Sequence, residues 1–223
     1  MKTTAVVPVY NENPEKLAQV LSNLKNYVDD IVVVDDGSAI AISNFQFPIS
    51  NLTLLRHEIN RGQGAALQTG TDFAVQNGAE IIIHFDSDGQ HNPEDIPALI
   101  KPIEEGRVDF VFGSRYLSEN NNIPWTKKHL LHPLARLVNY LFTGLKLSDA
   151  HNGLRAFRAD IADQIQLTQD RMAHATEIMR LVKQNKIRYT EVAVRIDYHR
   201  YGQGFKGGLK VIRELLTGKI IRS

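Results

Sequence analysis

The stretch IIIHFDSDGQH, residues 81–91, joins an apolar run to a polar loop that carries two aspartates. A short, continuous apolar run that ends in turn residues is typical of a strand buried on both faces of a sheet. Asp86 and Asp88 follow the run directly, and carboxylate oxygens are hard ligands that suit Mg²⁺ or Mn²⁺. The stretch therefore predicts a buried strand whose end can hold a divalent cation and, through it, a diphosphate. An ordinary turn is the alternative, because Asp and Gly also favour turns.

Similar apolar runs recur along the first half of the chain, and helical patterns lie between them. We expect helices that begin at Asn13–Pro14 and at Asn92–Pro93, and another over residues 64–77 that Gly78 ends. Apolar strands separated by amphipathic helices indicate an α/β fold, in which helices cover both faces of a mostly parallel sheet. The expected strands are residues 5–9, 31–34, 52–55, 81–85 and 109–112.

Polar clusters follow four of these strands, at the point where each strand ends. In a parallel sheet these ends meet at one edge, where ligands bind. Asp35 or Asp36 can accept hydrogen bonds from a base or ribose, and Gly37 allows the chain to turn close to a ligand. Gln90 and His91 can supply a further metal ligand or an outer-shell hydrogen bond to a ligand. The clusters are residues 10–12, 35–38, 86–91 and 113–116.

Composition limits the class of protein. A chain of 223 residues with 43% hydrophobic residues can bury a sizeable core, and we expect one domain. The absence of cysteine excludes disulfides and thiolate metal sites. We find neither a signal peptide nor the ~18 consecutive apolar residues that a membrane span needs. We therefore expect a cytoplasmic protein that is soluble or peripheral on the membrane, with no nucleic-acid partner.

Charge is distributed unevenly. Residues 1–110 carry 7 Lys or Arg against 16 Asp or Glu, and residues 180–223 carry 11 against 3. The asymmetry favours an acidic half that binds a metal and a basic part that meets phosphates or an anionic surface. A solvated basic face is the simpler interpretation.

Six short motifs occur in series: PVYNE at 8–12, VDDGS at 34–38, NRGQGAA at 60–66, DSDGQH at 86–91, GSRY at 113–116 and NGLRAF at 152–157. In this order they resemble family 2 glycosyltransferases, particularly the branch of dolichol-phosphate mannose synthase and bacterial polyprenyl-phosphate sugar transferases. The resemblance implies a GT-A fold, a Rossmann-like, mostly parallel sheet, as one domain over residues 1–223. Residues 1–112 would form the half that binds the nucleotide sugar and metal, and residues 113–223 the half that binds the acceptor.

The resemblance also implies roles for matching residues in the first half. The metal, Mg²⁺ or Mn²⁺, would be held by Asp86, Asp88 and Gln90. Ser87 would join the two aspartates at the diphosphate, and Asp36 would lie near the base and ribose of a UDP-, GDP- or dTDP-hexose. The nucleotide pocket implied in this way includes Pro8, Tyr10, Glu12, Val34 and Asp36.

In the second half the implied roles fall on basic residues. Arg115 would lie near the reacting phosphates. Arg200 and Lys206 match a pair that clamps the diphosphate or the acceptor phosphate, although Phe205 stands where the family has a serine. With Arg155, Arg115 can bind an acceptor phosphate bidentately.

The residues leave two kinds of acceptor open. A sugar hydroxyl needs a general base, whereas a lipid monophosphate is already largely anionic near neutrality and needs orientation instead. Asp149 and Glu177 are candidate bases that would complete a catalytic set with Asp88 and Arg115. A helix carboxylate that pairs with a nearby arginine is an equal interpretation of Glu177.

Two segments, residues 123–147 and 208–221, mix apolar and basic side chains in helical patterns. Such helices can lie on an anionic membrane, and they can equally pack on the catalytic domain or between the subunits of a homo-oligomer. If the product stays on a membrane, a separate membrane protein can receive it.

The leading hypothesis is an inverting, metal-dependent transfer of a hexose from a nucleotide sugar to a polyprenyl phosphate at the cytoplasmic face of a membrane. Transfer to a glycan hydroxyl, as in cell-surface polysaccharide synthesis, is the alternative. A further alternative is a module that binds the nucleotide sugar without turnover. A nucleotidyltransferase is disfavoured, because the first strand is not followed by a Gly-rich loop bearing Lys or Arg.

Overall fold

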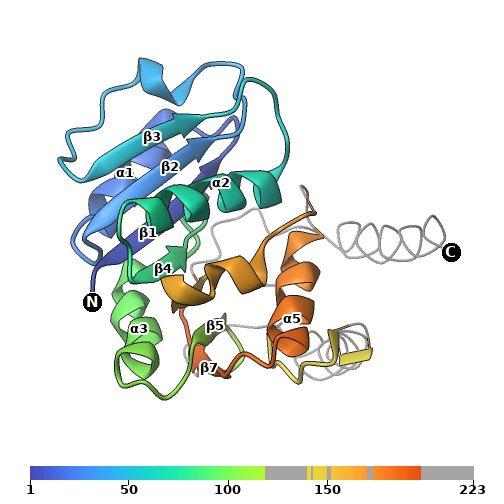
Figure 1. Ribbon diagram of the computed structural model, residues 1–223. Coiled ribbons are helices and arrows are strands. Elements are labelled where there is room, and N and C mark those ends of the chain that lie inside the picture. The colour runs from blue at the N-terminus through green and yellow to red at the C-terminus, as the bar shows by residue number, and fades with distance from the viewer. Residues whose placement is uncertain (119–139, 142, 150–151, 170–172, 197–223) are drawn as a thin grey trace, which may run out of the picture.

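The computed structural model describes residues 1–118, 140–141, 143–149, 152–169 and 173–196. These residues form a seven-stranded sheet flanked by helices (Figure 1). The strands are β1 (Thr3–Val9), β2 (Asp30–Asp35), β3 (Leu52–Arg56), β4 (Ile81–His84), β5 (Phe110–Ser114), β6 (Arg155–Arg158) and β7 (Tyr189–Ala193). The helices are α1 (Pro14–Leu24), α2 (Gln63–Gln76), α3 (Ile96–Glu104) and α5 (His174–Gln184), with 3₁₀ turns η1 (Ile42–Asn44), η2 (Pro93–Asp95) and η4 (Ala159–Ile165).

The strand order is β3-β2-β1-β4-β6-β5-β7. All neighbouring strands pair in parallel except β6, which is antiparallel to both β4 and β5. The predicted α/β fold with a mostly parallel sheet is therefore confirmed. The strands β6 and β7 were not among the expected ones, because each carries charged residues that interrupt an apolar run.

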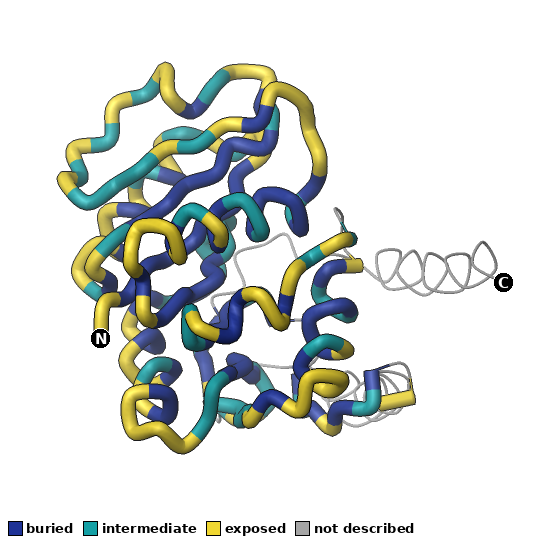
Figure 2. Tube along the Cα trace, viewed as in Figure 1, coloured by how far each residue is buried: buried dark blue, intermediate teal, exposed yellow. Residues whose placement is uncertain are grey.

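Strand residues alternate between two cores, one on each face of the sheet. On one face Ala5, Val7 and Val9 pack with the apolar side of α1 and with α3. On the other face Val6 and Ile82 pack in a second core that includes residues of α2, η4 and α5. Because both faces are covered, successive residues of the inner strands are buried, as Figure 2 shows in dark blue. This explains the continuous apolar runs.

Local capping explains where the helices begin. The Asn13 side chain accepts hydrogen bonds from the backbone N–H groups of Glu15 and Lys16, at 2.9 and 3.1 Å, and Pro14 is the first helical residue, as predicted. The helix expected from Asn92 is corrected. Pro93 opens a 3₁₀ turn, and the α-helix begins at Ile96. Since Pro97 has no N–H, it cannot donate to the Pro93 carbonyl as an α-helix requires.

No helix within the described ranges is long and apolar enough to cross a membrane. Most of residues 123–147 and all of residues 208–221, the two segments predicted as amphipathic helices, lie outside the described residues.

Candidate active site

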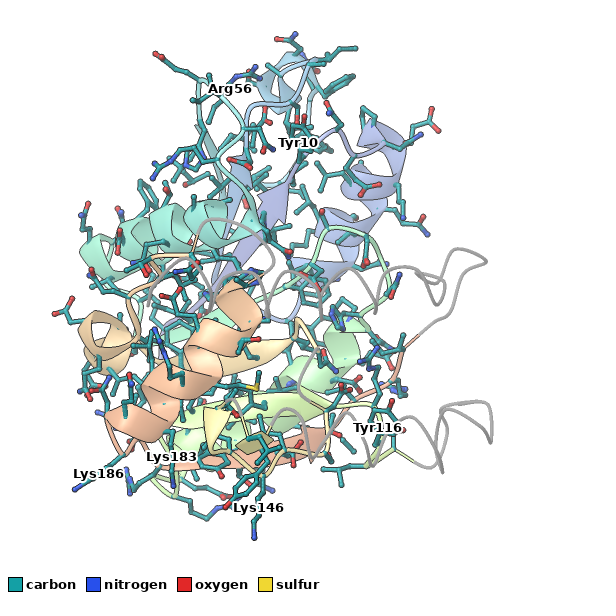
Figure 3. The ribbon with its side chains drawn as sticks, turned by 90° about the vertical axis from the view of Figure 1, so that its right-hand side faces the viewer. Tyr10, Arg56, Tyr116, Lys146, Lys183 and Lys186 are labelled. Atoms are coloured by element: carbon teal, nitrogen blue, oxygen red, sulfur yellow. The ribbon has the colours of Figure 1, made fainter. Side chains whose placement is uncertain are left out.

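Loops that follow the parallel strands meet at the carboxyl edge of the sheet. The Asn11 backbone N–H donates to Ser38 Oγ, and the Ala39 N–H donates to Asn11 Oδ1, both at 2.9 Å, so the loops after β1 and β2 are tied together. Figure 3 looks onto the molecule from the right-hand side of Figure 1 and labels Tyr10 and Tyr116, which follow β1 and β5. The sequence predicted that these strand ends share one edge of the sheet, and in Figure 3 Tyr10 and Tyr116 lie well apart along it.

Asp35 holds the loop after β2 in place. Its buried carboxylate accepts hydrogen bonds from the backbone N–H groups of Ser38 and Ile42, at 2.9 and 3.0 Å, and pairs with Arg56 at 2.7 Å. Burial by itself would raise the pKa of the Asp35 carboxyl, but the hydrogen bonds from Ser38 and Ile42 and the charge of Arg56 outweigh it and lower the pKa. Asp35 therefore has a structural role.

We expect Asp35→Asn to destabilise the folded protein by about 1–3 kcal/mol at pH 7, because an amide N–H₂ would face backbone donors. A lowered folded-state pKa stabilises the protein above the unfolded value, near 3.8, and the stabilisation is lost as pH falls through the folded value. Urea unfolding at pH 7 and about pH 3 should show the two proteins converging in acid. Asp163→Asn, at an exposed position, is the control, and equal stability of wild type and Asp35→Asn at pH 7 would contradict the role.

Asp36 is also bound by the protein itself. Its carboxylate accepts the N–H groups of Arg61 and Gly62, at 2.9 and 2.6 Å, and contacts His57 Nδ1 at 2.7 Å. Because a carboxylate only accepts hydrogen bonds, the Nδ1–H of His57 is the donor to Asp36, and the second ring nitrogen, Nε2, lies 2.9 Å from Thr69 Oγ1. Asp36, predicted at the base and ribose, thus fixes the loop that leads into α2.

Gly37 adopts a φ of +73° beside this loop. A Cβ on Gly37 would lie 2.6 Å from the Asn60 nitrogen and from the Ile59 carbonyl carbon. Backbone therefore packs directly on backbone, which only glycine allows in this conformation. The close approach expected for Gly37 is to the chain itself.

The other predicted nucleotide-pocket residues fall into two groups. Pro8 and Val34 are buried within paired strands, and Val34 packs against Ala66 of α2. Tyr10 is 53% exposed, and Glu12 is half-buried with Lys16 Nζ at 3.8 Å from its carboxylate. The side chains of Tyr10 and Glu12 thus lie on the rim, while Pro8 and Val34 shape it from within the sheet.

Asp86 is anchored from both sides. Gln63 Nε2 donates to Oδ1 at 2.9 Å, and His91 Nε2 lies 3.2 Å from Oδ2. Burial would raise the pKa of the Asp86 carboxyl, but the hydrogen bond and charge of His91 and the charges of Arg155 and His174 lower the pKa. Asp86 is therefore a fixed anion at the end of β4.

Arg155 lies on β6, beside β4, and is almost completely buried. Burial lowers the pKa of its guanidinium to about 10, while the Asp86 carboxylate acts in the opposite direction. Its Nε donates to the Gly153 carbonyl at 3.1 Å. Arg155 was predicted to bind an acceptor phosphate together with Arg115, but its described surroundings are those of a buried counter-charge to Asp86.

Ser87, Asp88 and Gln90 are half-exposed, in contrast to the strand that precedes them. Asp88 Oδ1 accepts the Gln90 backbone N–H at 3.0 Å, and Gly89 has a φ of +69°, so a tight turn presents both side chains. Within the described ranges no three acidic or histidine side chains form a complete metal site. Mg²⁺ and Mn²⁺ bound to substrate phosphates need only one or two carboxylates from the protein. The residues of this turn fit such an ion.

Arg115 and Asp149, both predicted in the catalytic set, form an ion pair. Arg115 Nε and Nη2 donate to the two carboxylate oxygens at 2.6 and 2.7 Å, and the Arg115 backbone N–H donates at 3.0 Å. The bidentate geometry fixes the plane of the guanidinium. Asp149 is buried and thus orients Arg115.

Glu177 is buried in the first turn of α5. Its carboxylate accepts hydrogen bonds from the Thr168 backbone and hydroxyl, at 3.0 and 2.5 Å, and from the Gln169 N–H at 2.8 Å. These contacts give the Glu177 carboxylate a structural role, and its hydrogen-bond partners among the described residues are Thr168 and Gln169. Arg200 and Lys206 lie outside the described residues.

Sequence reasoning missed Gln63, Gly153 and Glu191. Gln63 belongs to the motif NRGQGAA and Gly153 to NGLRAF, so both positions could have been recognised from the sequence as site residues. Glu191 on β7 gave none, because a single glutamate in a polar edge strand has no distinctive spacing.

Comparisons with known proteins agree with this geometry. Residues 4–166 match the model of the family described as glycosyl transferase family 2. The UDP-N-acetylglucosamine–dolichyl-phosphate N-acetylglucosaminyltransferase of Methanococcus voltae is 31% identical, over 96% of this chain and 95% of that protein. The undecaprenyl-phosphate mannosyltransferase of Micrococcus luteus is 29% identical, over 75% of this chain and 70% of that protein.

Among solved structures, the chain is similar to glucosyl-3-phosphoglycerate synthase from Mycobacterium tuberculosis, crystallised with Mn²⁺, uridine diphosphate and glucosyl-3-phosphoglycerate. The TM-score is 0.66 at 18% identity, over 97% of this chain and 79% of that chain, a likeness that concerns the fold. With its sheet order, its acidic turn after β4 and the family match over most of its length, the chain belongs to the family 2 glycosyltransferases and has the GT-A fold.

Proposed function

We propose that this glycosyltransferase transfers a hexose from a nucleoside-diphosphate sugar to a polyprenyl phosphate, with inversion at the anomeric carbon. The names of the relatives from Methanococcus voltae and Micrococcus luteus support a lipid phosphate as acceptor. The observation that carries the proposal is that both predicted bases, Asp149 and Glu177, are buried and bound by the protein. A phosphate acceptor needs no such base, whereas a sugar hydroxyl does.

On the donor side, the rim residues Tyr10 and Glu12 would contact the nucleotide, and Asp36 would act by holding the loop that leads into α2. Asp88 and Gln90, with Asp86 behind them, would hold Mg²⁺ or Mn²⁺. When bound, the ion would stabilise the negative charge that develops on the departing diphosphate. Because both oxygens of Asp86 already accept hydrogen bonds, Asp88 is the principal carboxylate ligand in this proposal.

On the acceptor side, Arg115 would orient the lipid phosphate for in-line attack on the anomeric carbon. An anionic phosphate oxygen attacks without losing a proton, so its position determines the rate. Ile196 pairs with His91 in an antiparallel bridge, so the chain that leads to Arg200 and Lys206 begins beside the acidic turn. This supports a role for both residues at the diphosphate. Because the acceptor is a lipid, we place the reaction at the cytoplasmic surface of a membrane.

The test is incubation with radiolabelled UDP-, GDP- and dTDP-hexoses, Mg²⁺ or Mn²⁺, and either polyprenyl phosphate or soluble glycans. We expect the label to enter the organic phase as an acid-labile sugar–phosphate lipid, and only when divalent ion is present. Label found solely in water-soluble glycan would favour the hydroxyl acceptor. Tight binding of a nucleotide sugar without any transfer would instead indicate that the protein is a nucleotide-sugar-binding module without catalytic activity.

A further inference from the structure

Glu191 lies on the edge strand β7, directly opposite Phe112 of β5. Its carboxylate reaches the segment of residues 148–149, which is distant in sequence. Oε1 accepts hydrogen bonds from the Ser148 N–H, the Ser148 hydroxyl and the Asp149 N–H, at 2.8, 2.7 and 3.2 Å, and Oε2 accepts the Ser148 N–H at 2.9 Å. A half-buried carboxylate with this many donors fixes two successive residues of the segment.

The fixed segment leads directly to the candidate phosphate ligand. Asp149, whose N–H is held by Glu191, binds Arg115 through both carboxylate oxygens. Ser148 Oγ also lies 2.5 Å from Ser114 Oγ, at the end of β5 and next to Arg115. A continuous chain of hydrogen bonds therefore runs from β7 through residues 148–149 to the Arg115 guanidinium.

We propose that Glu191 is a positioning residue for the transfer reaction, which orients Arg115 toward the acceptor phosphate by holding Ser148 and Asp149. The inference rests on the proposed function for the identity of that phosphate. Glu191 touches no reacting atom in this proposal. It acts through Asp149, because a shift of the segment of residues 148–149 would move the Asp149 carboxylate and, with it, the Arg115 guanidinium.

Two substitutions separate hydrogen bonding from packing. In Glu191→Gln the carbonyl oxygen, placed at Oε1, keeps all three donors, while the amide nitrogen at the Oε2 position loses the second contact with the Ser148 N–H, so we expect kinetics much closer to wild type than those of Glu191→Ala. In Glu191→Ala we expect KM for polyprenyl phosphate to rise about tenfold or more, which is the effect of losing hydrogen bonds to a charged group. Binding of nucleoside diphosphate with Mn²⁺, measured by calorimetry, should stay within about twofold of wild type, because the donor half is untouched. An unchanged KM in Glu191→Ala would overturn the proposal.

A double-variant cycle tests whether Glu191 acts through Arg115. If it does, adding Glu191→Ala to Arg115→Ala causes little further loss, whereas independent effects would multiply and contradict the proposal. Arg188→Gln is the matched control. Arg188 precedes the same strand and forms a bidentate ion pair with Asp109, at 2.8 and 2.7 Å. This pair lies at the amino end of β7, away from the candidate site, so the loss of Arg188 should leave KM unchanged.

An NMR readout keeps this inference separate from the proposed function. The Nε–H resonance of Arg115, assigned by its absence in Arg115→Ala, should move toward the position of solvated arginines in Glu191→Ala and stay in place in Glu191→Gln and Arg188→Gln. If wild type transfers no sugar to polyprenyl phosphate, the proposed function fails, and the resonance still decides the role of Glu191. A resonance unmoved in Glu191→Ala would refute the coupling.

Discussion

Asp88→Ala is expected to lower metal-dependent turnover by about a thousandfold or more while leaving the fold intact. Asp88 is half-exposed and, unlike Asp86, is not held by Gln63 and His91, and loss of the ion would remove several kcal/mol of charge stabilisation from the transition state. Among the described residues, the Asp88 carboxylate accepts one hydrogen bond, from the Gln90 N–H of its own turn, so the free energy of unfolding should change by less than about 1 kcal/mol.

Transfer assays over a range of Mn²⁺ concentrations, together with thermal melts, test this expectation. Asp72→Ala is the matched control, because Asp72 is an exposed aspartate on α2 that likewise accepts one local hydrogen bond, from Gln68. Wild-type turnover in Asp88→Ala would remove Asp88 from the metal site. A lowered turnover restored by more Mn²⁺ would indicate weakened binding of the ion rather than loss of its site.

Gly153→Ala is expected to lower turnover about 100-fold through Asp86. A Cβ on Gly153 would lie 1.9 Å from Asp86 Oδ2 and 2.6 Å from its Cγ, far inside van der Waals contact. Asp86 cannot retreat without breaking its hydrogen bonds to Gln63 and His91, and Arg155 is buried beside it. A displacement of about 1 Å at the anchored carboxylate is enough for a loss of this size.

The same substitution should cost about 1–3 kcal/mol of stability, the usual range for overpacking. Gly78→Ala supplies a control that is destabilised without touching the site. Gly78 has a φ of +79°, so alanine is strained there by roughly 1 kcal/mol, but a Cβ would meet nothing within 4 Å. Nucleotide binding and turnover should fall in Gly153→Ala and not in Gly78→Ala. Normal turnover in Gly153→Ala would mean that the position of Asp86 is unimportant.

The inner parallel strands β1, β2, β4 and β5 were predictable because burial on both faces leaves an unbroken apolar run, as in residues 81–83. The helix from Pro14 was predictable because its cap is local in sequence. The strands β6 and β7 were not predictable. Arg155 on β6 is tolerated only where β4 and β5 flank it and Asp86 supplies a counter-charge, and the edge strand β7 is only half-buried and carries Glu191. From the sequence alone, an arginine such as Arg155 indicates an exposed loop, because the groups that pair with it in the fold are not visible in the sequence.

The candidate site divides in the same way. The sequence by itself determined the family, the edge of the sheet where the site lies, and the acidic turn of residues 86–91. These features depend only on the order of the motifs and the chemistry of their residues, which do not require the fold to be known. Only the tertiary structure decided which carboxylates are already bound by the protein: Asp35, Asp36, Asp149 and Glu177 accept hydrogen bonds from donors brought close by folding. Asp86 and Asp88 are both aspartates and stand two positions apart in the sequence. Gln63 and His91 bind the two carboxylate oxygens of Asp86 but not those of Asp88, whose carboxylate is therefore the better placed to bind an ion. The physical reason is that a carboxylate's role depends on the donors around it, and those donors come from residues distant in sequence.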